Sequence, residues 1–375
     1  MTFRYAEGAW SRPFPDLDSP RTLVLAFAAP SYGMRGELFG ELRRAYPQAA
    51  VIGCSTAGEI EATQIRDGSI TVAAVRFERT RVRCGRARIT AAAESFAAGG
   101  ALGAELAAPD LRVVIVLSRG HDVNGSELIR GLNATLPPSV VVTGGLAGDD
   151  DRFGQTFVVA DGHVATDAIV AVGLYGEHVR VGHGSQGGWD VFGHERVVTK
   201  SRGNVLYTLD GRPALALYKE YLGERAAGLP GSALLFPLSL RASLDSKESV
   251  VRTVLGVDEA TQTMVFAGDI PEGAYAKLMR ANFDRLILGA QAAGHAVLRE
   301  QLPSRGPALS IAISCVGRRL VLGERTEEET EAALEELPPG TRQVGFYSYG
   351  EISPHTSGRC DLHNQTMTLT VLSEA

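Results

Sequence analysis

One order of segments occurs three times along this chain, and it limits the possible folds more than any single motif. Each copy has an apolar, β-favouring segment, a segment with helical spacing, a second apolar segment, a turn containing glycine and a third strand candidate. The copies span residues 21–77, 111–175 and 308–372. Strands that alternate with helices predict an α/β fold in which helices cover the sheets. Because each turn leads directly into another strand, we expect mixed sheets rather than purely parallel ones.

The repeats also predict where the domains divide. The chain has 375 residues, more than one hydrophobic core usually serves, so two domains are expected. In the first two copies the last strand leads into a Val-Arg-x-Gly segment, which predicts an internally duplicated domain over residues 22–215, with units at about 22–90 and 112–187. Residues 216–372, with the third copy, form the second domain. No Pro/Ser-rich linker separates them, so we expect close packing.

Composition and charge exclude several classes of protein. The formal charge is -6, and Lys and Arg are scattered, so the chain shows no basic surface of the kind that binds nucleic acid. No segment has the apolar length of a signal peptide or a membrane span, which predicts a cytoplasmic protein without membrane insertion. The four cysteines are far apart and form no CxxC pair, so we expect neither a zinc site nor a disulfide framework.

The three turns share a chemistry that suits a ligand. Residues 57–59, 147–149 and 349–351 align as a small or aromatic residue, a glycine and an acid. Glycine lets the backbone approach a ligand, consecutive N–H groups can hold a carboxylate or phosphate oxygen, and the acid can hold an ammonium group. Such a turn suits a zwitterion such as an amino acid. Alternatively, the glycines only provide the backbone conformation that tight turns need, and the acids accept local backbone hydrogen bonds. The sequence leaves both interpretations open.

A phosphate-binding loop is a poor match to the first turn. Gly53 and Gly58 have the spacing of a P-loop, but Glu59 stands where that motif needs a lysine, and an acid would repel phosphate. The Gly-x-Gly-x-x-Gly spacing of a dinucleotide-binding turn is missing as well. We therefore expect no nucleotide at this turn.

Cys54, in the same stretch, is a candidate nucleophile, because surrounding backbone N–H groups would stabilise its thiolate. It would need a base, and no sequence pattern selects one of the eight histidines. The positions aligned with it, Gly144 and Phe346, are not nucleophiles, which favours a small buried residue at a strand end. A Cys54-dependent hydrolase or transferase is kept as a third alternative.

Aromatic residues of the third copy extend the candidate site. Phe346, Tyr347 and Tyr349 lie along one strand candidate, where side chains alternate between the two faces, so they could form the wall of a pocket. Core packing explains Phe346 equally well. Asn364, which precedes the last strand candidate, is a further residue that could face a ligand.

Six segments of the chain, taken in order, resemble the FIST family of sensory proteins. They lie at residues 51–60, 144–150, 202–223, 236–238, 250–273 and 345–372. The likeness is to an N-terminal FIST domain followed by a C-terminal FIST domain. It implies intracellular sensing of a small ligand, with amino acids proposed for the family, and signalling to a regulatory partner without catalysis. Some relatives are haem proteins that sense nitric oxide and regulate a histidine kinase, which makes a haem-based sensor the alternative.

We therefore predict a non-catalytic sensor that binds an amino acid or a related metabolite and signals through a separate protein, such as a histidine kinase. No catalytic residue, metal or cofactor is expected, and haem stays open because a single axial histidine needs no particular spacing. The residues expected around the ligand are Gly53, Cys54, Ser55, Thr56, Gly58, Glu59, Gly145, Gly148, Asp149, Tyr347, Tyr349, Gly350, Glu351 and Asn364.

Overall fold

The three copies fold alike in the computed structural model, which describes residues 1–375 except 247–248, 299–301, 303–305 and 355–358. The first has β3 (Thr22–Ala28), α1 (Gly36–Ala45), β4 (Ala50–Ser55) and β7 (Ile70–Arg76). The second has β9 (Leu111–Ser118), α3 (Gly125–Thr135), β10 (Val141–Leu146) and β13 (Ala168–Tyr175). The third has β23 (Leu309–Cys315), α6 (Val316–Leu322), α7 (Thr326–Glu335), β24 (Arg342–Ser348) and β27 (Met367–Glu374). In every copy the first strand is parallel to the second and antiparallel to the last, which confirms the α/β fold with mixed sheets.

The copies are joined in a ring. After each turn a short strand leaves its own copy and pairs, antiparallel, with the second strand of another copy. The pairs are β5 (Glu59–Glu61) with β24, β11 (Val158–Ala160) with β4, and β25 (Gly350–Pro354) with β10. Each second strand would otherwise be an exposed sheet edge, so the exchange protects all three edges at once. It also brings the three turns together in space.

Further strands complete the three sheets. They are β1 (Thr2–Ala6), β2 (Ala9–Trp10), β6 (Gln64–Arg66), β8 (Arg81–Arg88), β12 (His163–Ala165), β14 (Val179–Gln186) and β26 (Cys360–His363). Two of them, β8 and β14, cross to pair with the last strand of the next copy. The resulting orders are β12-β11-β4-β3-β7-β1-β2, β26-β25-β10-β9-β13-β8 and β14-β27-β23-β24-β5-β6. Every sheet therefore contains strands from more than one copy.

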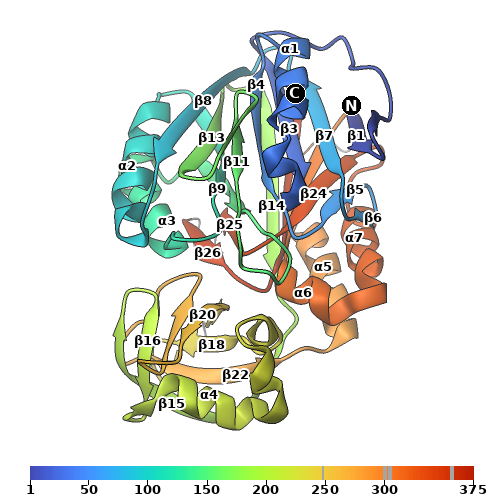
Figure 1. The fold of residues 1–375 in the computed structure, drawn as a ribbon. Helices are drawn as coiled ribbons and strands as arrows, with labels where there is room; N and C mark the ends of the chain where they lie inside the picture. Colours follow the sequence, from blue (N-terminus) through green and yellow to red (C-terminus); the bar gives the residue numbers. More distant parts are fainter. Residues whose placement is uncertain (247–248, 299–301, 303–305, 355–358) are drawn as a thin grey trace.

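A smaller region lies below the ring in Figure 1 and is formed by residues 190–280. Its elements are β15 (Asp190–Arg202), β16 (Val205–Leu209), β17 (Arg212–Pro213), α4 (Ala214–Leu222), β18 (Leu238–Arg241), β19 (Val250–Arg252), β20 (Val254–Asp258), β21 (Thr263–Phe266) and β22 (Tyr275–Arg280). The sheet order is β19-β18-β22-β15-β16-β21-β20, so both sides of residue 215 share one sheet. The division of the chain into domains at residues 22–215 and 216–372 therefore stays a prediction from the sequence.

The core lies between the three sheets and between the sheets and their helices. One cluster of buried side chains unites the copies and includes Leu25, Ile52, Ile115, Ile313 and Phe346. On the outer faces, α1 packs on the first copy, and α2 (Ser95–Leu106) with α3 packs on the second. Helix α5 (Phe283–Val297) packs against α7 and the third sheet. Burial on both faces explains why the central strands are continuous apolar runs.

The third copy differs from the sequence-based prediction, in which its first apolar segment, the strand candidate at residues 308–320, continues past Cys315. Strand β23 ends at Cys315, and the next seven residues form α6. A helix of two turns is too short to show a clear helical period in its sequence.

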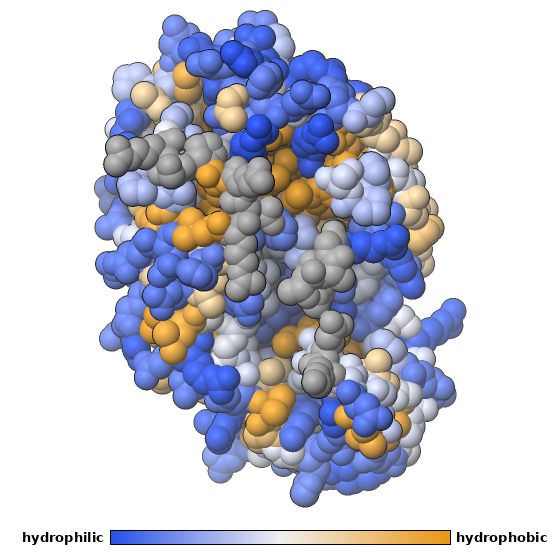
Figure 2. Space-filling model, turned by 180° about the vertical axis from the view of Figure 1, so that it is seen from behind, coloured by the Kyte–Doolittle hydropathy of each residue, from blue (hydrophilic) through white to orange (hydrophobic). Residues whose placement is uncertain are grey.

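Two surface features complete the description. Hydrophobic surface gathers in a hollow in the upper half of the rear face, between hydrophilic side chains (Figure 2). Among the described helices, none combines the length and the apolar character needed to cross a membrane.

Candidate functional site

The three turns meet at the centre of the ring through backbone hydrogen bonds. Each turn donates one N–H to a carbonyl oxygen of another copy. These bonds are Ala57 N to Tyr347 O (2.8 Å), Gly148 N to Ser55 O (3.1 Å) and Tyr349 N to Leu146 O (3.2 Å). The three donors are therefore equivalent, and the turns form a near-threefold ring.

This ring corrects the alignment of the second turn by one residue. Because Ala57, Gly148 and Tyr349 are equivalent, the counterpart of Glu59 and Glu351 is Asp150, while Asp149 takes the place of a glycine. A second observation agrees. A Cβ atom at Gly53, Gly144 or Gly345 would lie 2.0, 1.8 or 1.7 Å from a carbonyl oxygen of the neighbouring strand. Gly144 therefore matches Gly53, and Gly145, rather than Gly144, is the counterpart of Cys54. The adjacent glycines at 144 and 145 allow either register in the sequence.

Glu59 is held by hydrogen bonds within its own copy. Its carboxylate accepts from Thr56 Oγ1 (2.5 Å), from Ser69 N (3.0 Å) and from Ser69 Oγ (2.7 Å). The side chain is buried, with 1% of Glu59 exposed. Burial raises the pKa of Glu59 to about 7, although these hydrogen bonds favour the ionised form.

Glu351 has the same surroundings in the third copy. It accepts hydrogen bonds from Ser348 Oγ (2.7 Å), Thr366 N (3.1 Å) and Thr366 Oγ1 (2.9 Å). It is fully buried, and burial raises its pKa to about 8. Local hydrogen bonding, one of the two interpretations open from the sequence, therefore describes both glutamates.

Asp149 fixes the loop that follows the second turn. Its carboxylate accepts from Gly154 N (2.7 Å), Gln155 N (2.8 Å) and the hydroxyl of Tyr349, and His121 Nε2 lies 3.7 Å away. Burial opposes ionisation, but His121, Tyr349 and the Gly154 N–H outweigh it and lower the pKa of Asp149 to about 2. Asp149 is therefore a charged anchor for this loop.

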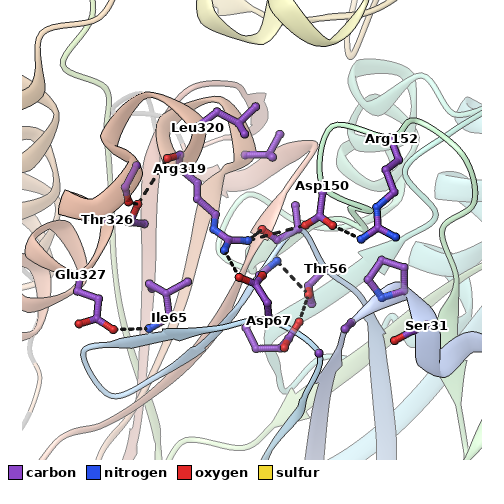
Figure 3. Close-up of a pocket in the computed structure, with 18 of the residues that line it drawn as sticks. Ser31, Thr56, Ile65, Asp67, Asp150, Arg152, Arg319, Leu320, Thr326 and Glu327 are labelled. Carbon is purple, nitrogen blue, oxygen red and sulfur yellow. Dashed lines mark hydrogen bonds and ion pairs between the residues drawn. The ribbon is translucent and has the colours of Figure 1, made fainter.

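A pocket of about 640 Å³ opens in front of the first turn, and all three copies line it (Figure 3). The first copy supplies residues 56–59 and Asp67, the second supplies Asp150 and Arg152, and the third supplies helix α6. We call it the Glu59 pocket. Its volume is within the range of small-molecule sites in proteins.

Arg319 of α6 is the central cation of the Glu59 pocket, and the sequence analysis missed it. Its guanidinium donates to Ala57 O (2.5 Å) and to Asp67 Oδ2 (2.6 Å) and lies 3.8 Å from Asp150 Oδ1 (Figure 3). It also lies over the ring of Tyr347. Gly58 makes this possible, because its φ is +124° and a Cβ atom there would lie 2.4 Å from Arg319 Nη1. The neighbouring Arg-Arg pair was the available signal, but these residues were assigned to a strand.

The charge of the Glu59 pocket is predominantly negative. Two guanidinium groups, of Arg152 and Arg319, face a larger number of carboxyl groups. The carboxyl groups are those of Glu59, Asp67, Asp150, Glu324 and Glu327. Arg152 is the more accessible cation, since 62% of its side chain is exposed and its carboxylate partner is Asp150. An ammonium group would therefore find several partners here.

At the third turn, residues of the described part of the chain fill the space that the pocket occupies at the first turn. Asn364 Nδ2 donates to Tyr349 O (3.4 Å), and Asn364 Oδ1 accepts from Thr253 N (3.3 Å). Leu362 lies against Gly350. Thr253 belongs to the smaller region, so that region closes the third turn.

The structure places the predicted site residues in three environments. Thr56, Gly58 and Glu59 line the Glu59 pocket. Asp149 lines a neighbouring pocket of about 350 Å³, which shares Pro30, Ser31 and Arg152 with the first. The others lie in the ring, in the core or at the third turn, and their roles in binding stay predictions: Gly53, Cys54, Ser55, Gly145, Gly148, Tyr347, Tyr349, Gly350, Glu351 and Asn364.

Cys54 and the histidines bear on the two alternative functions, a Cys54-dependent enzyme and a haem-based sensor. The Cys54 thiol is fully buried in the central core, and burial raises its pKa well above the ordinary value, the opposite of what activates a nucleophile. The residues that line the Glu59 pocket include no histidine. The described residues contain no cluster of three or more His, Cys, Asp or Glu side chains placed to hold a metal ion. Haem binding stays a prediction.

Family models match most of the chain, and one relative and one solved structure resemble it. The FIST N domain matches residues 22–212, and the FIST C domain matches residues 214–354. An uncharacterized protein of Methanocaldococcus jannaschii is 30% identical over 185 residues, which is 44% of this chain and 32% of that protein. This chain thus spans about a third of the length of that relative. A crystal structure of a cyanuric acid hydrolase from A. caulinodans covers 94% of this chain and 89% of its own, with 8% identity and a TM-score of 0.32.

Proposed function

The chain belongs to the FIST family, and from that membership we propose that it is a non-catalytic sensor whose small ligand binds in the Glu59 pocket. FIST domains are associated with sensing and signal transduction. The observation that supports the proposal most is the origin of the pocket: one turn, one loop and one helix, each from a different copy, line it together. A ligand there would contact all three copies at once.

The charges of the pocket favour an amino acid or a related amine. A carboxylate offers about four acceptor positions, and Glu59 uses three of them within its own copy. The remaining position, together with Asp67 and Asp150, suits an ammonium group. The exposed guanidinium of Arg152 can hold a carboxylate at the outer end. The proposed ligand therefore places its ammonium inward and its carboxylate outward.

Arg319 connects binding to a signal in this proposal. It contacts Ala57 and Asp67 of the first copy and lies near Asp150 of the second. A ligand ammonium that binds Asp67 or Asp150 competes with Arg319 for these carboxylates. It therefore changes the contacts that Arg319 makes between the copies. We infer that a separate signalling protein recognises the resulting change at the surface.

Thermal unfolding in the presence of free amino acids and amines tests the proposal. A ligand at about a hundred times its dissociation constant stabilises the folded protein by about 2.7 kcal/mol and raises the Tm. Glu351 gives a matched control, because it has the same hydrogen-bond network and is not among the described residues that line the Glu59 pocket. We expect E351Q to keep the ligand-induced rise in Tm and E59Q to lose most of it.

D67N is a second variant that tests binding with little risk to folding, since 68% of the Asp67 side chain is exposed. It should weaken the response to amines without lowering the Tm of the free protein appreciably. A panel without any stabilising compound, or an equal response from E59Q and E351Q, would contradict the proposal.

A further inference from the structure

A second large pocket lies at the other end of the strands that reach the Glu59 pocket. Strand β7 begins beside Ser69, which binds Glu59, and ends at Arg76, while β23 begins at Leu309 and leads into α6. Residues around Arg76, Leu309 and the start of β24 at Arg342 line this second pocket. Its volume is about 630 Å³. We call it the Arg342 pocket.

The floor of the Arg342 pocket is apolar. Phe77, Leu309 and Leu372 line it and are buried against the central core, with Leu17 and Val75 beside them partly buried. These side chains come from segments far apart in the sequence, so the hollow is a product of the folded ring. An apolar body of a ligand can be removed from water here.

The rim of the Arg342 pocket carries three guanidinium groups, of Arg76, Arg79 and Arg342. Within the described part of the chain, none of them forms an ion pair or a side-chain hydrogen bond. Two acidic side chains, of Glu78 and Glu374, also line the pocket, as do the terminal residues Met1, with its amino group, and Ala375, with its carboxyl group. Glu374 is already used, because it accepts hydrogen bonds from Arg79 N (2.9 Å), Thr80 N (2.6 Å) and Thr80 Oγ1 (2.7 Å).

This combination differs from the Glu59 pocket in the sign of its charge. There, carboxyl groups outnumber guanidinium groups, and Arg319 is bound to carboxylates. Here, three unpaired guanidinium groups surround an apolar hollow. A guanidinium group matches a carboxylate in both charge and geometry.

We propose that the Arg342 pocket binds a small amphipathic carboxylate, such as a medium-chain fatty acid, with its apolar chain on the floor and its carboxylate between the arginines. This site is separate from the one proposed for the amine ligand. The experiments on the two sites can therefore succeed or fail independently.

Displacement of a fluorescent amphipathic anion from the purified full chain tests this proposal. The probe is anilinonaphthalene sulfonate, and the competitor is decanoate. Decyltrimethylammonium is the matched control, because it has the same alkyl chain and the opposite charge. We expect decanoate to displace the probe at a concentration at least about tenfold lower than decyltrimethylammonium. Within the series from hexanoate to decanoate, each added methylene should improve competition roughly threefold to fourfold.

Substitution of the arginines locates the site. R76Q, R79Q and R342Q should each weaken competition by decanoate about two- to fivefold, as expected for partly exposed charges, and the triple variant at least tenfold. R112Q is the control, because Arg112 is exposed on β9, away from the pocket. Equal competition by both alkyl compounds, unchanged competition in the triple variant, or no binding of the probe would overturn the proposal.

Discussion

Glu59 and Glu351 should make this protein less stable as the pH rises from about 4.5 to about 8. Burial raises the pKa of Glu59 to about 7 and that of Glu351 to about 8, from an ordinary value of 4.5. In the unfolded chain both groups ionise near the ordinary value. Between these pH values the folded protein binds more protons than the unfolded chain, so the free energy of unfolding falls as the pH rises.

The magnitude follows from the two pKa values. At about 1.36 kcal/mol per pKa unit, the rise to about 7 for Glu59 corresponds to about 3 kcal/mol, and the rise to about 8 for Glu351 to about 5 kcal/mol. Each contribution is fully present below about pH 4.5 and is lost as the pH passes the folded pKa. Because folded domains are typically stable by only about 5–15 kcal/mol, the loss should be easy to measure.

Urea unfolding at a series of pH values measures this effect in the wild type, E59Q and E351Q. Glutamine keeps the shape of the side chain but does not titrate. E59Q should remove about 3 kcal/mol of the pH dependence and E351Q about 5 kcal/mol. E327Q, at an exposed position of the Glu59 pocket, serves as the control. A wild-type pH dependence in both E59Q and E351Q would refute the reasoning.

Two further substitutions test the first turn and a buried ion pair behind the pocket, between Arg318 of α6 and Glu329 of α7. G58A should lower the free energy of unfolding by about 2 kcal/mol in urea titrations and abolish the ligand-induced rise in Tm. The reason is that Gly58 has a φ of +124° and that Arg319 occupies the space a Cβ atom would need. R318M should cost about 3–5 kcal/mol by the same measurement, because it leaves Glu329, 2.7 Å from Arg318, as a buried charge. R318M/E329L should be less destabilised than R318M alone, and the opposite order would show that the lone charge is not the cause.

The repeated pattern allowed much of the fold to be predicted, because each copy repeats the same local order of strands, helix and turn. The exchange of strands between copies could not be predicted in this way. Pairs such as Phe346 with Glu59 join residues that are far apart in the chain, and hydrophobic periodicity contains no information about which edges meet. The sequence-based prediction therefore could not show that the three turns converge, and their role in ligand binding stays a prediction.

The candidate site was only partly visible in the sequence for two physical reasons. Gly144 and Gly145 are adjacent, so the second turn can be aligned in two registers, and only contacts of the folded chain, such as the hydrogen bond of Gly148 to Ser55, select one. Arg319 follows a buried strand on a helix of seven residues, which is too short for its period to separate it from the strand. Its importance comes from contacts with the first and second copies.

Three equivalent turns do not give three equivalent sites, because each copy places different residues in front of its turn. At the second turn, Asp149 replaces the glycine and its carboxylate is used to fix the following loop and Tyr349. At the third turn, Asn364 and Thr253 fill the space and attach the smaller region. At the first turn, Gly58 leaves room for Arg319 and the pocket stays open. The contacts that hold the molecule together thus occupy two positions of the ring, and the pocket proposed for the ligand lies at the turn that contains Glu59.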